Sequence, residues 1–265
     1  MYTIIARRQL CANVISLTLL APRIAAGIRP GQLVLLRPSA GAQPIPLSVT
    51  DWDPTMGTIT IVLQAGTGTQ TLSEKRPGDC VQDLTGPLGH PAPLEGIRRA
   101  VVTAGGLGCA VAYPLAKALH LSGCYIHSIL GFRNRELMLL QEEFSIVSDH
   151  LTIVTDDGSF GEKALVTDPL KRLLEAGEDY DLVIAMGSLA MMKFVSITTT
   201  PYGIPTLLPA LPDTLESPVP LSLAALTTPS GNHAAIPFGP DALRSFPAAH
   251  ANTPPQSSFR PSRSP

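Results

Sequence analysis

The sequence is poor in cysteine and lacks metal-binding patterns. Its 265 residues include four cysteines, and no two of them form a C-x-x-C pair. Isolated cysteines indicate neither a disulfide framework nor a metal site, and no group of histidine and cysteine has metal-ligand spacing. The sequence therefore predicts a protein that holds no metal ion. The four cysteines are Cys11, Cys80, Cys109 and Cys124.

Long apolar runs and a strong net charge are also absent. No apolar stretch reaches the length of about 18 residues that a membrane-spanning helix needs. Residues 1–12 lack the layout of a signal peptide. The formal net charge of −2 gives no reason to expect nucleic acid or an anionic membrane as a partner. These absences predict a soluble, cytoplasmic protein.

The first part of the chain has the pattern of an all-β domain. Residues 2–94 contain short segments rich in β-branched and aliphatic residues, separated by pairs such as Pro-Gly and Asp-Pro that favour turns. This spacing predicts a small antiparallel barrel or sandwich. The expected strands are 3–7, 14–20, 32–37, 58–64 and 80–84, with one short helix at 69–74.

After Gly96 strand and helix patterns alternate, which predicts a parallel sheet covered by helices on both faces. The expected strands are 100–104, 125–130, 151–155, 181–186 and 204–208. The expected helices are 110–121, 139–147, 167–176 and 189–199. In such a sheet ligands bind beyond the carboxyl ends of the strands. The loops 105–108, 131–134, 155–159 and 187–188 should therefore share one rim.

Two glycine-rich turns have features of phosphate sites. Gly105, Gly106 and Gly108 follow an apolar strand and open a helix, so backbone N–H groups face a ligand there. Gly66-Thr67-Gly68 precedes the short helix in a similar way. Each pattern also fits an ordinary turn that caps a helix, and spacing alone does not separate the two interpretations.

The C-terminal segment has a different composition. Residues 207–265 contain 12 of the 26 prolines and no lysine, tyrosine or cysteine. A segment of this kind buries little apolar surface, so its composition predicts disorder.

Six short motifs follow one another along the chain. They are Ile45-Pro46-Leu47-Ser48, Gly66-x-Gly68-Thr69, Gly86-Pro87-Leu88-Gly89, Gly105-Gly106-x-Gly108, Asp156-Asp157-Gly158-Ser159 and Met191-Met192-Lys193. In this order they resemble one branch of the ferredoxin-NADP reductase superfamily, and the resemblance covers residues 1–206. The branch contains the electron-transfer subunit of dihydroorotate dehydrogenase and the small subunits of sulfide dehydrogenase and of NADH-dependent ferredoxin-NADP oxidoreductase.

The resemblance implies an N-terminal antiparallel β-barrel that binds FAD (1–96), a parallel-sheet α/β domain that binds NAD(P)H (97–206) and a disordered tail (207–265). The residues that would contact FAD are Pro46, Leu47 and Ser48 along the isoalloxazine, with Ser48 as the catalytic residue near N5, and Gly66, Gly68 and Thr69 at the pyrophosphate. The residues that would contact NAD(P)H are Gly105, Gly106 and Gly108 at the pyrophosphate, Arg133 and Asn134 by the ribose, and Asp156, Asp157 and Gly187 on the nicotinamide side.

Some of these residues have plainer interpretations. Asp156-Asp157-Gly158 fits an ordinary turn after a strand. Met191 and Met192 fit the core side of the last helix. Arg133 and Arg135 would suit a 2′-phosphate and so NADPH, although Arg135 also fits a solvated surface charge.

The sequence departs from the family pattern in three places, of which the smallest is the glycine loop, with Ala104 and Ala110-Val111 where relatives usually have Gly and Ala-Pro. Pro44 stands where relatives carry an arginine that pairs with the flavin phosphate, so FAD binding should be weaker unless Arg37 or the Gly66–Thr69 loop compensates. The cysteine-rich segment that holds a 2Fe-2S cluster in relatives is replaced by the proline-rich tail, which has no thiolate ligand. One hypothesis is that the tail is read out of frame.

The function implied is that of a flavoprotein subunit. It would exchange a hydride between NAD(P)H and FAD and pass electrons to a larger catalytic subunit. A docking subunit that has lost its flavin and a stand-alone flavin reductase are the alternatives. The sequence leaves open the partner, its substrate and the choice between NADH and NADPH.

Overall fold

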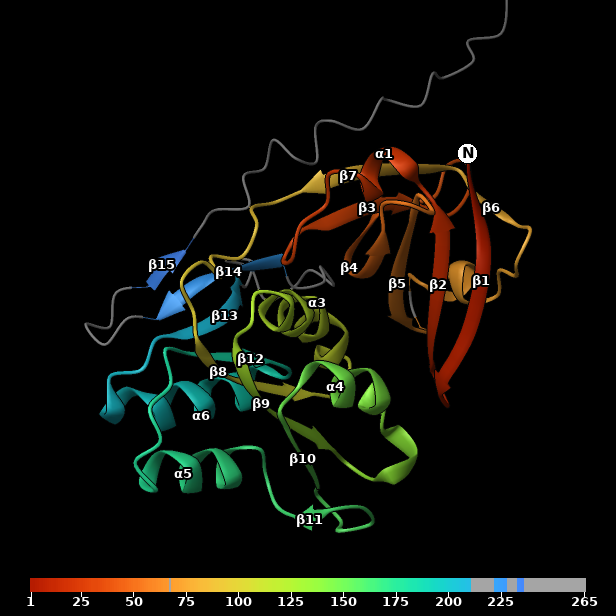
Figure 1. The fold of residues 1–265 in the computed structure, drawn as a ribbon. Coiled ribbons are helices and arrows are strands. Elements are labelled where there is room, and N and C mark those ends of the chain that lie inside the picture. The colour runs from red at the N-terminus through yellow and green to blue at the C-terminus, as the bar shows by residue number, and fades with distance from the viewer. Residues whose placement is uncertain (67, 211–221, 228–232, 236–265) are drawn as a thin grey trace, which may run out of the picture.

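The protein is described by a computed structural model that covers residues 1–66, 68–210, 222–227 and 233–235. Figure 1 shows two units, a curled β-sheet built from the first part of the chain and a helix-covered sheet built from the second. The expected class, a β-barrel followed by a parallel-sheet α/β unit, is confirmed.

Seven antiparallel strands form the first unit in the order β6-β1-β2-β5-β4-β3-β7. The edge strands β6 and β7 are separated only by Gln82, whose N–H donates to the carbonyl oxygen of Arg37 at 3.0 Å, so the barrel nearly closes. The elements are β1 (Tyr2–Cys11), β2 (Val14–Leu20), α1 (Pro22–Ala25), β3 (Leu33–Arg37), β4 (Ile45–Asp53), β5 (Thr58–Gln64), α2 (Gln70–Ser73), β6 (Cys80–Val81) and β7 (Asp83–Leu88).

The barrel core follows from alternation along the strands. In β2, Ile15, Leu17 and Leu19 are buried, whereas Ser16 and Thr18 between them are half-buried. Successive side chains of a strand point to opposite faces, so this period of two places one apolar row inside the barrel.

The second unit is a sheet in the order β11-β10-β9-β8-β12-β13-β14-β15. Neighbouring strands from β11 to β13 are parallel, and β13, β14 and β15 are antiparallel. Its elements are β8 (Arg99–Gly105), α3 (Gly108–Leu121), β9 (Tyr125–Phe132), η1 (Arg135–Leu137), α4 (Gln141–Val147), β10 (His150–Thr155), β11 (Glu162–Lys163), α5 (Thr167–Glu175), β12 (Leu182–Met186), α6 (Leu189–Thr199), η2 (Thr200–Tyr202), β13 (Thr206–Ala210), β14 (Ser222–Thr227) and β15 (His233–Ala235).

Helices cover both faces of this sheet. From β8, Ala100 and Val102 pack in one apolar cluster with residues of α3 and α4. Val101, between them, packs in another cluster with Leu170 of α5 and Val195 of α6. Because a strand covered on both faces buries successive side chains, the apolar run Ala100–Val102 in β8 is explained.

The chain continues as strand beyond the expected boundary at residue 206. Of the segment expected to be disordered, residues 207–210, 222–227 and 233–235 are in strands. The other positions of that segment lie outside the described residues. Within the described part of the chain, no helix has the length and apolar character to cross a membrane.

Candidate functional site

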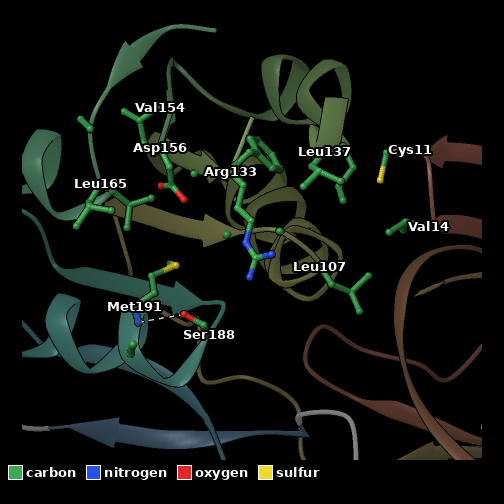
Figure 2. Close-up of a pocket in the computed structure, with 18 of the residues that line it drawn as sticks. Cys11, Val14, Leu107, Arg133, Leu137, Val154, Asp156, Leu165, Ser188 and Met191 are labelled. Atoms are coloured by element: carbon green, nitrogen blue, oxygen red, sulfur yellow. Dashed lines mark hydrogen bonds between the residues drawn. The ribbon is translucent and has the colours of Figure 1, made fainter. Parts of the chain in front are cut away.

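A cavity of about 570 Å³ lies at the carboxyl ends of the parallel strands, where they face the end of the barrel (Figure 2). The α/β unit contributes residues from the loops after β8, β9, β10 and β12. The barrel contributes residues from the β1–β2 turn and from the end of β5. The barrel residues on the lining are Cys11, Asn13, Val14 and Gln64.

The glycine-rich turn after β8 forms the floor next to α3. Gly105 and Gly106 line the cavity, and Gly106 has a φ of +53°, a backbone conformation that favours glycine. Gly108 does not line it, but a Cβ at Gly108 would collide with the carbonyl oxygen of Met186. The turn therefore needs glycine for close packing against the end of β12, and α3 begins at the cavity rim.

Arg133 and Asp156 bring opposite charges to the rim. Both line the cavity, and Figure 2 shows the Arg133 guanidinium extending into the space between Leu107 and Met191. Among the residues that the structure describes, neither side chain is in an ion pair. A guanidinium with this position can meet a phosphate, and a carboxylate can accept hydrogen bonds from a ribose diol.

Other predicted nucleotide residues lie beside the cavity and have structural partners. The Asn134 side chain accepts a hydrogen bond from the Leu137 N–H at 3.1 Å. The Asp157 carboxylate accepts from the Ser159 N–H at 2.9 Å. Hydrogen bonding with the Ser159 side chain, and then with its backbone, lowers the pKa of Asp157. Gly187 is not on the lining, although the structure places it at the end of β12.

Of three cavity residues near the last helix, the sequence places only Ser188 on the rim, as part of the loop 187–188. Ser188, Met191 and Phe194 line the cavity, and the Ser188 hydroxyl accepts a hydrogen bond from the Met191 N–H at 3.2 Å. Met191, for which the sequence favours a core position, is half-buried, packs against an apolar cluster of the α/β unit and also faces the cavity (Figure 2). A serine at a helix N-cap directly after a strand was the signal available for this loop.

The predicted flavin residues of β4 lie on both faces of the strand. Leu47 is 6% exposed and packs in the barrel core, so only its backbone could meet a ligand outside the barrel. Pro46 and Ser48 alternate with it and are half-buried on the other face. The register pairs Leu33 with Ser48 and Leu35 with Pro46, which places both on a continuous sheet surface.

The loop after β5 is open enough for a phosphate group. A Cβ built at Gly66 or at Gly68 meets no atom within 4 Å, and Gly68 has a φ of +87°. The Thr69 hydroxyl donates to the Gln64 carbonyl oxygen at 2.6 Å, which links the loop to a residue of the cavity lining. These residues fit the pyrophosphate of FAD, although none of the six predicted flavin residues lines the cavity itself.

Arg37 is adjacent to the position of the missing arginine. Leu36 pairs with Ile45 in the antiparallel register, so the next residue of β3, Arg37, lies opposite Pro44. One guanidinium nitrogen of Arg37 lies 3.4 Å from a carboxylate oxygen of Asp83. The chain thus retains a cation next to β4, and this cation is paired with a carboxylate of β7.

Solved structures define the class of protein. The chain superposes on the structure of an NADH-dependent reduced ferredoxin-NADP oxidoreductase with a TM-score of 0.75 and 32% identity, over 82% of this chain and 78% of the other. It superposes on phthalate dioxygenase reductase with a TM-score of 0.61 and 17% identity, over 75% and 63%, a likeness that shows the fold. The protein therefore has the fold of the FAD- and NAD-binding ferredoxin-NADP reductases.

Curated relatives define the family. A Thermotoga maritima homologue of the dihydroorotate dehydrogenase B (NAD(+)) electron transfer subunit is 36% identical over 203 residues, which are 76% of this chain and 71% of the relative. The Geobacillus thermodenitrificans electron transfer subunit is 35% identical over 198 residues, 72% and 75%. No protein-family profile matches the chain. The chain belongs to the family of dihydroorotate dehydrogenase B electron transfer subunits, and the resemblance inferred from its motifs is confirmed.

Proposed function

We propose that the protein exchanges a hydride between a nicotinamide nucleotide and FAD, and that it passes the electrons to a larger catalytic subunit. The observation that carries the proposal is the cavity, which has one wall from the end of the barrel and the other from the glycine-rich rim of the parallel sheet. The nicotinamide would lie in this cavity and would meet a flavin held by β4 at the barrel end, since none of the predicted flavin residues lines the cavity itself. Membership of an electron-transfer family supports the same function.

The nucleotide pyrophosphate would lie on the turn of Gly105 and Gly106, with Arg133 as its counter-charge. Its nicotinamide arm must point toward the barrel, where the flavin strand lies. Its adenosine arm must then point along the rim toward β10, which lies on the side of the sheet away from the barrel (Figure 1). We therefore assign Asp156 to the adenosine ribose, in place of the nicotinamide side that the resemblance implied.

This assignment favours NADH. A carboxylate accepts hydrogen bonds from a ribose 2′-hydroxyl and repels a 2′-phosphate, whereas NADP sites use an arginine there. The relatives named above carry NAD(+) in their names. Arg133 would be engaged by the pyrophosphate and so would not serve a 2′-phosphate.

The flavin would lie along Pro46 and Ser48 of β4, with its pyrophosphate at Gly66, Gly68 and Thr69. FAD supplies the two-electron chemistry, so the chain needs no acid or base for the transfer. Its residues have to hold two rings in register and keep water out. Ser48, as the residue next to N5, would donate a hydrogen bond to that edge.

The experiment is an anaerobic titration of the purified protein with NADH and with NADPH, followed by flavin absorbance. We expect a yellow protein whose absorbance near the flavin maximum is bleached by about one equivalent of NADH, because one hydride carries the two electrons that FAD accepts. Flavin that stays oxidised with both nucleotides would contradict the proposal.

The second candidate is a docking subunit without flavin, and Pro44 is the observation that favours it. With no arginine at this position, the flavin phosphate loses a bidentate partner. A folded, colourless protein that takes up no added FAD would support this candidate. Restoration of FAD uptake by Pro44→Arg would identify the lost arginine as the reason.

A further inference from the structure

We propose that the ion pair between Asp51 and Lys117 positions β4, the proposed flavin strand, against α3, the helix that begins at the nucleotide turn, for hydride transfer. This inference rests on the proposed function. Lys117 Nζ lies 2.6 Å from Asp51 Oδ1, and each side chain is about a third exposed, at 35% and 37%. The pair joins α3, which begins at the glycine-rich turn, to β4, which carries Pro46 and Ser48.

A β-bulge aims Asp51 at the helix. The register pairs Val49 with Ile61 and Asp51 with Thr60, so the strand contains an extra residue between them. In regular alternation Asp51 would point into the barrel core, as Leu47 and Val49 do. The bulge turns the carboxylate outward, to the side on which Ser48 lies, which is the effect that bulges have next to functional sites.

The pair borders a well-packed contact between the two units. Tyr113 precedes Lys117 by one helical turn, is 9% exposed and packs edge-on against Phe144 at 5.7 Å between ring centroids. Burial raises the pKa of Tyr113 to about 12, with added contributions from the carboxylates of Asp51 and Glu143. Tyr113 therefore lies near two acidic groups that come from different units.

A second ion pair crosses the same contact. Arg8 of β1 donates to Glu143 of α4 at 2.7 Å, with the Arg8 side chain 60% exposed. The barrel residues Val14 and Val62 also pack in the apolar cluster that contains α3. The two pairs are similar in length, and Glu143 is 24% exposed. The apolar contact holds the units together, and the Asp51–Lys117 pair is the one whose residues lie on β4, which carries Pro46 and Ser48, and on α3, which begins at the glycine-rich turn.

The relative position of the two units matters because the rate of hydride transfer depends steeply on the distance between the reacting atoms. The reacting atoms must approach to about 3–3.5 Å, and a misplacement of about 1 Å lowers the rate roughly 100-fold. Asp51 lies three residues beyond Ser48, about 10 Å along the strand. A shift at this contact therefore moves the proposed ring site relative to the nucleotide turn.

The test compares charge reversal with charge exchange. Lys117→Glu places two acids together, and the double variant Asp51→Lys with Lys117→Glu restores an ion pair of opposite direction. Lys171→Glu is the matched control, because Lys171 pairs with Glu175 of the same helix, at 3.6 Å on the exposed surface of α5. All variants are measured as the full chain loaded with FAD.

Two readouts separate this inference from the proposed function. In stopped-flow reduction at saturating NADH, we expect Lys117→Glu to lower the limiting rate about 10-fold with little change in NADH affinity, and the exchanged pair to recover most of the rate. In hydrogen exchange without nucleotide, we expect faster exchange in the peptides of β4 and α3, again recovered by the exchanged pair.

A reversal that behaves like Lys171→Glu in both readouts would overturn the inference, as would a slow rate that the exchanged pair does not recover. If the wild-type flavin is not reduced by NADH, the proposed function fails. In that case unchanged hydrogen exchange in Lys117→Glu would also overturn the inference. Faster exchange in Lys117→Glu that returns to the wild-type rate in the exchanged pair would support the role of the ion pair in holding β4 against α3.

Discussion

Asp156 and Arg133 lie next to each other on the cavity rim, because the residues before them, Thr155 and Phe132, are register partners in β10 and β9. The Asp156 N–H also donates to the Phe132 carbonyl oxygen at 3.0 Å. Despite this proximity, no ion pair within 4.0 Å joins the two side chains in the described part of the chain. The rim therefore presents two opposite charges that remain available to a ligand.

Removing the charge of Asp156 should reduce the preference for NADH. In Asp156→Asn we expect the ratio of kcat/KM for NADH to that for NADPH to fall about 10-fold, since a hydrogen bond to a charged group contributes about 1.5–3 kcal/mol. Weaker repulsion of the 2′-phosphate acts in the same direction. Steady-state kinetics with both nucleotides and an artificial electron acceptor measure the ratio.

Asp157→Asn is the matched control, because the carboxylate of Asp157 is engaged by the Ser159 N–H and lies outside the cavity lining. It should leave the nucleotide ratio unchanged. Equal effects of the two substitutions would show that the turn, and not the Asp156 charge, sets the preference. A wild-type preference for NADPH would contradict the assignment of Asp156 to the ribose.

Neutralising Arg133 should weaken the binding of both nucleotides. Arg133→Gln removes the cation that we assign to the pyrophosphate, so we expect Kd to rise about 10-fold for NADH and NADPH alike, with the limiting rate little changed. Arg135→Gln is the control, since Arg135 lies outside the lining and its guanidinium is 5.9 Å from the Phe160 ring. A loss confined to NADPH would place Arg133 at a 2′-phosphate instead.

Much of the fold could be predicted because the chain obeys simple patterns. The helix expected at 189–199 has those bounds in the structure, and so do the strands expected at 14–20 and 58–64. The strand β4 was missed as an element because Pro46 and the acidic residues near its end look like turn residues. Its bulge at Thr50 also breaks the period of two on which strand prediction depends.

The sequence predicts the residues on the α/β side of the cavity and not those on the barrel side. Gly105, Gly106, Arg133 and Asp156 follow strands of one sheet, so the rule for parallel sheets brings them together. The barrel side of the cavity comes from the β1–β2 turn and from Gln64. These residues reach the cavity through packing between two units distant in sequence, which no local pattern encodes. The Asp51–Lys117 pair has the same origin.

Gly108→Ala should damage the nucleotide site by displacing the turn. The added methyl group would collide with the Met186 carbonyl oxygen and lie 2.7 Å from the Gly187 N, which are backbone atoms that cannot rotate away. We expect a stability loss of about 1–3 kcal/mol, typical of overpacking, together with weaker NADH binding. Urea unfolding and nucleotide titration measure the two effects.

Gly27→Ala provides the control for this substitution, because a Cβ there meets only ordinary contacts at 3.8 Å or more. It should leave NADH binding unchanged. If Gly108→Ala binds NADH as tightly as the wild-type protein, close packing at this turn is not a requirement of the site.

A histidine pair should make stability depend on pH. His127 in β9 and His150 in β10 are register partners, with ring centroids 5.5 Å apart, and His127 Nε2 lies 2.9 Å from Thr152 Oγ1. Burial lowers the pKa of His127, repulsion from His150 lowers it further, and Glu178 partly opposes the shift. The pair lies away from the cavity lining, so its effect falls on stability.

The sign of the pH effect follows from linkage. Since the pKa of His127 is lower in the folded protein than the unfolded value of about 6.5, the unfolded state binds more protons, and stability falls as pH drops through that value. We expect urea midpoints to fall between about pH 7.5 and about pH 5.5. His127→Gln should reduce this fall most and His150→Gln less, because His150 is only the second cause of the shift. His90→Gln, at an exposed position, should not alter it. A fall of the same size in His127→Gln and the wild-type protein would assign the pH dependence to other groups.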